Sequence, residues 1–66
     1  MSELLTDREV QVLQLLADGK TIKDASRSLK LAEITLKRYT AEIRSKLEAP
    51  TTPNAVATAI RRGLID

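Results

Sequence analysis

The sequence contains no cysteine, histidine, tryptophan or phenylalanine, and its single tyrosine is the only aromatic residue. Without cysteine, disulfide bonds and thiolate chemistry are excluded. Without histidine, the chain lacks the usual imidazole metal ligand and the usual base at neutral pH. There is also no glycine-rich phosphate loop, and the acidic residues lie at helix starts and on exposed faces, where helix dipoles explain them. We therefore expect no enzyme activity, no metal and no cofactor.

Long apolar runs are also absent. No run approaches the roughly 20 residues that span a bilayer, and the opening MSELLTDRE is acidic, with no apolar signal region. A cytoplasmic location is expected. The 66 residues are enough for one small domain, predicted over 1–66, which buries roughly 60% of the surface that its unfolded chain exposes. Whether they are a complete protein or an output domain stays open, because the initial Met fits both.

The charged residues are unevenly placed along the chain. The net charge is +2, but residues 1–19 carry one cation and four anions, residues 20–46 carry eight cations and three anions, and residues 47–66 carry two of each. A basic segment on an otherwise balanced domain indicates a polyanionic partner. A solvated, lysine-rich helix surface is the alternative explanation.

Helical periodicity and helix-end signals predict an all-α fold with four helices, over residues 7–18, 22–29, 33–48 and 53–62. Thr6 followed by Glu9 matches a capping box at the first helix. Gly19 stands where a left-handed residue closes that helix. Thr52 before Pro53 is the expected start of the fourth helix.

The predicted helix over 33–48 has two unlike faces. At about 100° per residue, an inner face falls within about 40° of Leu36 and comprises Leu36, Thr40, Ile43 and Leu47. An outer face lies about 140° to 200° away and comprises Ile34, Arg38, Ala41 and Ser45. Lys37 and Arg44 flank the outer face on one side, and Thr35 and Glu42 flank it on the other.

The outer face suits the major groove of DNA. An α-helix with its side chains is about 10–12 Å wide, and the groove is about 12 Å wide. Lys37 and Arg38 can donate to guanine O6 and N7, Ile34 can touch a thymine methyl, and Ala41 leaves room for close approach. Thr35, at the helix start, can bond a phosphate. The alternatives are simple solvation of the two cations and a threonine hydroxyl bonded to its own backbone.

Motifs at both ends of the chain add a family resemblance. The stretch LTDREVQVLQLLADGK begins Leu-Thr-x-Arg-Glu and ends Leu-x-x-Gly, and NAVATAIRRGLI closes the chain. Between them lie Glu33, Thr35, Leu36 and Lys37, then Ile43, Lys46 and Leu47. Over residues 5–65 the chain resembles the LuxR/FixJ-type (GerE-like) helix-turn-helix DNA-binding domain.

The resemblance implies a transcriptional regulator that binds double-stranded DNA through helix 33–48. The expected base contacts are Lys37, Arg38, Ala41 and Ile34. The expected phosphate contacts are Thr35, Lys23 and Lys46, to which the basic segment adds Arg44 and Lys20. A weak homodimer is expected through the fourth helix, with Ala55, Ala59 and Arg62 at the interface and Val56 and Ile60 in the core. Ordinary small surface residues are the alternative for the two alanines.

Several positions depart from the family pattern, and three of them bear on the turn, the helix start and the candidate site. Ala32 stands where the family usually has a capping Ser or Thr, and losing that cap costs about 1 kcal/mol. Lys30 replaces the usual turn Gly, so a positive φ there would be strained. Tyr39 replaces a frequent His; we expect its ring at the edge of the core and its hydroxyl at the surface, with a DNA contact as the alternative.

Two other functions are compatible with the same helices. One is a small protein-interaction module or antagonist that binds a larger regulator through Ile34 or the fourth helix. The promoter-recognition domain of sigma factors has a similar opening, but the family-like fourth helix argues against it.

Overall fold

The computed structural model describes residues 5–66, which form four α-helices: α1 (Asp7–Ala17), α2 (Ile22–Leu29), α3 (Glu33–Leu47) and α4 (Thr52–Arg61). This range contains no strand, so the predicted all-α class is confirmed. Every helix begins and ends within one residue of the predicted position. Residues 1–4 of the predicted domain lie outside the described residues.

Side-chain caps begin three of the four helices. At α1 the Thr6 hydroxyl accepts from the Glu9 N–H at 3.1 Å, and the Thr6 N–H donates to the Glu9 carboxylate at 2.8 Å, so the predicted capping box is present. Gly19 closes this helix at φ 93°, in the left-handed conformation predicted for it. At α2 the Thr21 hydroxyl accepts from the Asp24 N–H at 3.0 Å.

The start of α4 differs from the prediction by one residue. Thr51, rather than Thr52, is the N-cap, and its hydroxyl accepts from the Asn54 N–H at 3.2 Å. Two adjacent threonines offer the same capping group, so the sequence pattern did not distinguish them. Pro53 consequently occupies the second position of the helix, where its missing N–H is still without an intrahelical partner.

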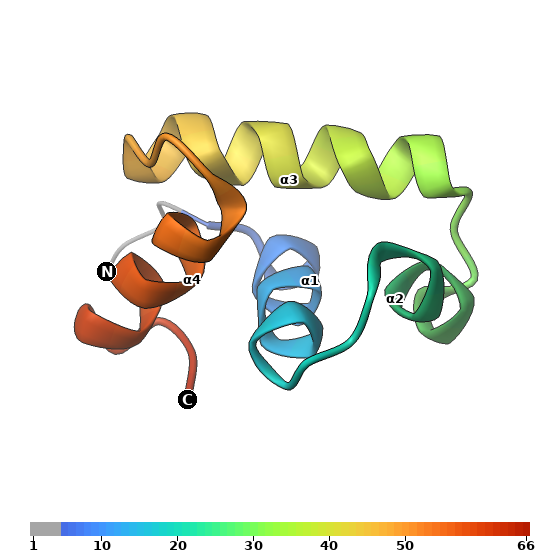
Figure 1. Ribbon diagram of the computed structural model, residues 1–66, viewed down its shortest axis with the longest axis horizontal. Helices are drawn as coiled ribbons and strands as arrows, with labels where there is room; N and C mark the ends of the chain where they lie inside the picture. The colour runs from blue at the N-terminus through green and yellow to red at the C-terminus, as the bar shows by residue number, and fades with distance from the viewer. Residues whose placement is uncertain (1–4) are drawn as a thin grey trace.

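The longest helix, α3, lies along one side of the molecule, and α1, α2 and α4 all contact it from its other side (Figure 1). Its predicted inner face is buried: Leu36 is 0% exposed, Ile43 1% and Leu47 3%. Thr40 shares this face, and its hydroxyl donates to the Lys37 carbonyl at 2.7 Å, which satisfies the buried polar group. The other buried apolar residues are Val12, Leu13, Ala25, Ala55, Ala59 and Ile65.

The predicted orientation of α4 is wrong. Ala55 and Ala59 are both 0% exposed, whereas Ile60 is 48% exposed and Val56 is only half-buried. Helix α4 packs against α3 and α1, and small residues on its inner side allow a close approach of the helices. Two apolar strips run side by side on α4, so periodicity alone did not decide which strip faces inward. Ala55 and Ala59 therefore cannot form a dimer interface on the surface.

Two turns hold a side chain in the left-handed backbone region. Lys30 at the end of α2 has φ 58°, and Glu48 at the end of α3 has φ 55°. This conformation costs a residue with a Cβ roughly 1–2 kcal/mol. Lys30 lies in the turn between α2 and α3, so the connection that joins these two helices is strained, as its replacement of the usual Gly led us to expect.

Ala32 is the N-cap of α3, with φ −68° and ψ 150°, and no side chain caps this helix end. We predict that Ala32→Ser raises the free energy of unfolding by about 0.5–2 kcal/mol, because a hydroxyl there can accept an unpaired N–H of the first turn. Denaturant melts of the two proteins measure the change. Ala57→Ser, an exposed position inside α4, serves as the control and should give no gain. An unchanged melt for Ala32→Ser would contradict the prediction.

Candidate nucleic-acid interface

The outer face of α3 is exposed to solvent. Ile34 is 65% exposed, and Lys37, Arg38 and Ala41 are also exposed. Because α1, α2 and α4 bury the opposite side of α3, this side of the helix runs uncovered along the edge of the molecule (Figure 1). The four residues predicted to contact bases are thus on one accessible surface.

A shallow hollow of about 210 Å³ lies beside the outer face and is lined by Thr35, Arg38, Tyr39 and Glu42. Tyr39 is half-buried and packs against the core cluster, which matches its expected place at the core edge. Thr35 is half-buried, and within residues 5–66 its hydroxyl takes part in no side-chain hydrogen bond. That hydroxyl therefore remains available to an external acceptor.

The predicted phosphate contacts occupy different environments. Lys20 and Lys23 are exposed, the first before α2 and the second in its first turn. Arg44 is half-buried, and its Nε atom is shielded from solvent with no hydrogen-bond partner among the described residues. The two lysines are therefore freely placed to meet an anion, whereas only part of the Arg44 guanidinium can do so.

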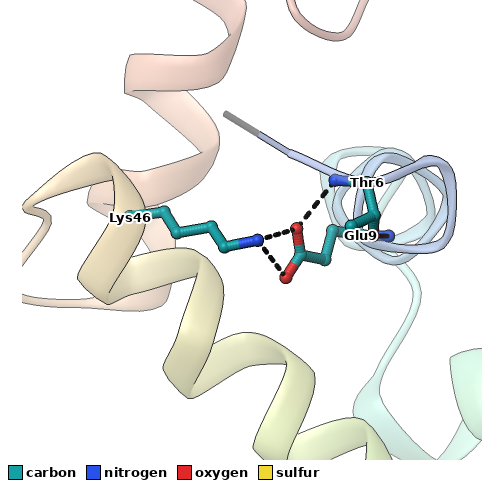
Figure 2. Close-up of polar contacts among 3 residues, drawn as sticks. All are labelled: Thr6, Glu9 and Lys46. Atoms are coloured by element: carbon teal, nitrogen blue, oxygen red, sulfur yellow. Dashed lines mark hydrogen bonds and ion pairs between the residues drawn. The ribbon is translucent and has the colours of Figure 1, made fainter. Parts of the chain in front are cut away.

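Lys46 is held in an ion pair that the sequence did not reveal. Its Nζ atom donates to the two carboxylate oxygens of Glu9 at 2.8 and 3.0 Å, across 37 positions of the chain (Figure 2). Glu9 is 2% exposed, and the same carboxylate also caps α1 through the Thr6 N–H. The Lys46 ammonium group is thus already paired with a carboxylate of the protein, and this pairing does not support its predicted role at a phosphate. Neither the capping motif nor helical spacing signals this long-range pair.

The environment of Glu9 acts on its pKa in two directions. Burial raises the pKa, but the hydrogen bonds from Lys46 and Thr6, together with the Lys46 charge, outweigh it and leave the pKa below the ordinary value of 4.5. The carboxylate is consequently ionised at neutral pH. It links the start of α1 to the last turn of α3 by charge-assisted hydrogen bonds.

Within residues 5–66, no helix is long and apolar enough to cross a membrane. The same residues contain no group of three or more acidic side chains that would hold a metal ion.

Comparison with known proteins identifies the family. The family described as "Bacterial regulatory proteins, luxR family" (GerE) matches residues 3–59. The chain belongs to this family. A solved structure titled "Structure of Transcription factor, GerE" superimposes on this LuxR-family chain with a TM-score of 0.93 and 31% identity, covering 98% of this chain and 97% of that one.

Three relatives illustrate the range of proteins that carry this domain. "Uncharacterized response regulatory protein YgeK" of Escherichia coli is 38% identical over 91% of this chain. "Transcriptional regulatory protein DesR" of Bacillus subtilis is 37% identical over 89%, and "HTH-type quorum sensing-dependent transcriptional regulator VjbR" of Brucella ovis is 38% identical over 100%. The chain spans only 41%, 30% and 26% of the length of these relatives, respectively.

Membership of the LuxR family confirms the predicted resemblance and the helix-turn-helix class. In this fold α2 and α3 are the two helices of the helix-turn-helix, with Lys30 in the turn between them. The chain is a DNA-binding domain of the transcription-regulator type, and its family is not a family of enzymes.

We predict that Lys46→Met lowers the free energy of unfolding by about 1–2 kcal/mol at neutral pH. Removing one partner of a fully buried ion pair costs about 3–5 kcal/mol, but Lys46 is 36% exposed and solvent already weakens this pair. Chemical denaturation measures the loss. Lys23→Met, which removes an exposed cation with no such partner, should change stability by less than about 0.5 kcal/mol.

The pH dependence of the same pair has a definite sign. Because the pKa of folded Glu9 lies below 4.5, the unfolded chain binds more protons, and the stabilisation is complete above the ordinary pKa and lost as pH falls through the folded one. In Lys46→Met the pKa of folded Glu9 moves up toward that of the unfolded chain, so the two states differ less in the protons they bind, and the variant should lose less stability in acid than the wild type does. Superimposable pH profiles would contradict this account.

Proposed function

We infer that the chain binds specific sequences of double-stranded DNA by placing α3 in the major groove. The observation that carries this inference is the exposure of the outer face of α3, with Lys37 and Arg38, opposite a fully buried inner face. A rigid helix about 10–12 Å wide fits a groove about 12 Å wide. Its action as a transcriptional regulator in the cytoplasm, where bacterial DNA lies, forms part of the proposal.

Each residue of the interface has a distinct chemical role. Lys37 and Arg38 donate to guanine O6 and N7, and the exposed Ile34 contacts a thymine methyl. Ala41 carries no long side chain, which lets the helix approach the base edges closely. Because these contacts differ between base pairs, they supply sequence specificity.

Contacts with the DNA backbone fix the register of the helix. The free hydroxyl of Thr35 bonds a phosphate at the start of α3, where unpaired N–H groups and the helix dipole favour an anion. Lys20 and Lys23 neutralise further phosphates. The exposed part of the Arg44 guanidinium contacts a phosphate from the flank of α3 opposite to Thr35. We leave Lys46 out of this set because Glu9 already holds its ammonium group.

We further propose a weak homodimer through the outer side of α4. Ile60 is 48% exposed, Val56 is half-buried, and Arg62 lies exposed just after the helix. These residues replace the buried Ala55 and Ala59 as the candidate interface. A second copy would place another α3 about one DNA turn away, over a palindromic site. The patch is small, so dimerisation is completed on DNA rather than in free solution.

A protein-interaction module is the second candidate function. It is favoured by the two large exposed hydrophobic side chains, Ile34 and Ile60. Such a module would bind a larger regulator with these residues and would not need Lys37 or Arg38. The two functions therefore differ in their dependence on the cations of α3.

The first functional prediction concerns these cations. Arg38→Ala should weaken binding to a site selected from a random DNA pool by about 1–3 kcal/mol and relax the preference at one base position. The double change Lys37→Ala, Arg38→Ala should reduce binding to the non-specific level. Fluorescence anisotropy at fixed salt measures the affinity, and Arg8→Ala, an exposed cation on α1, is the control. Unchanged binding by the double variant would rule out α3 as the recognition helix and favour the interaction module.

The second functional prediction concerns the homodimer. Ile60→Glu should weaken binding to a palindrome by about 10-fold or more, because like charges would meet across the twofold axis. Binding to a single half-site should change much less. Gln11→Glu adds the same charge to an exposed position of α1 and is the control, while Ala59→Glu should unfold the domain because it buries a charge. Equal losses on palindrome and half-site would exclude α4 as the interface.

A further inference from the structure

Glu42 is an anion on a surface that is otherwise suited to DNA. It is exposed on α3 and lines the hollow of about 210 Å³ together with Thr35, Arg38 and Tyr39. A carboxylate directed at a phosphate would be repelled. On a surface that faces DNA, the group that this carboxylate suits is therefore a hydrogen-bond donor.

The carboxylate has no cationic partner within the described residues. Arg38 lies one helical turn before Glu42, yet in residues 5–66 the ion pair that forms is between Lys46 and Glu9. An acid that follows a base at i, i+4 is the less favourable order on a helix. Both oxygens of Glu42 thus remain free to accept hydrogen bonds from a ligand in the hollow.

The spacing along α3 relates Glu42 to the position proposed for guanine recognition. Arg38 and Glu42 are separated by about 40° around the helix and about 6 Å along it. Base pairs are stacked about 3.4 Å apart. A helix lying along the groove floor therefore places the two side chains at base pairs one or two steps apart.

We propose that Glu42 is a specificity-determining residue that accepts a hydrogen bond from the N4 amino group of a cytosine in the major groove, one or two base pairs from the guanine bound by Arg38. This proposal rests on the proposed function of α3. In the major groove cytosine presents a donor, whereas guanine and thymine present acceptors that repel a carboxylate. Adenine has a donor at N6 beside an acceptor at N7, so it ranks between cytosine and the two disfavoured bases.

The test compares the DNA sequences selected from a random pool by the wild type, Glu42→Gln and Glu42→Ala. The wild type should enrich cytosine at one position of each half-site. Glu42→Ala should lose that preference, and Glu42→Gln should shift it toward adenine, because an amide bonds N6 and N7 together. Glu48→Gln removes the same charge from an exposed position just beyond α3 and outside the hollow, and this control should select the wild-type sequence.

A chemical substitution in the DNA supplies a second measurement. Replacing that cytosine with a pyrimidinone that lacks the N4 amino group should weaken wild-type binding by about 5-fold or more, the usual minimum effect of one wrong base pair. Glu42→Ala should bind the two duplexes equally. The side chain of Glu42 is exposed and forms no hydrogen bond or ion pair within the described residues. The melting curves of the variants should therefore match that of the wild type, which separates recognition from folding.

The outcomes distinguish this inference from the function on which it rests. If Glu42→Ala selects the same sequence with the same cytosine preference, while Lys37→Ala, Arg38→Ala abolishes selection, the role of Glu42 is overturned and the recognition helix stands. If the wild type selects no sequence at all, both proposals fall. Loss of the cytosine preference in Glu42→Ala but not in Glu48→Gln supports the inference.

Discussion

Burial of one side of α3 is the constraint on which the rest of this small domain depends. Leu36, Ile43 and Leu47 are almost completely removed from solvent, and all three other helices contact α3. A chain of this size has a limited core, so these side chains supply a large share of its hydrophobic stabilisation. Because a straight helix has rigid geometry, committing this side to the core determines which side chains point away from it. The surface proposed to bind DNA is therefore a consequence of the packing.

The Glu9–Lys46 ion pair adds directional hydrogen bonds to the non-directional packing of the helices. Hydrophobic contacts are non-directional, whereas the two short hydrogen bonds from Lys46 and the one from the Thr6 N–H require a defined placement of α3 relative to α1 (Figure 2). One carboxylate thus serves as helix cap and interhelical partner at once. Because Glu9 pairs with Lys46, the proposed interface relies on the cations at the start and middle of α3 and on the lysines near α2.

Helix α4 shows that packing decides which of its apolar side chains are buried and which are exposed. Ala55 and Ala59 lie inside, where the helices approach closely, and the larger Ile60 is 48% exposed. A single exposed isoleucine on a surface helix is ordinary, so the proposed interface on α4 rests on Ile60 together with the half-buried Val56. In the proposed function, the outer face of α3 recognises DNA and the outer side of α4 forms the homodimer.

Spacing along the chain was enough to predict the four helices, the inner face of α3 and the grouping of Lys37, Arg38, Ala41 and Ile34, because helical periodicity and caps are local properties. It did not reveal that Ala55 and Ala59 are core. Both strips of α4 are apolar, and periodicity does not say which one meets α3. Folding also sets the partner of Lys46, because it brings together two residues that are 37 positions apart in the chain. The left-handed backbone of Lys30 likewise follows from how α2 must turn into α3.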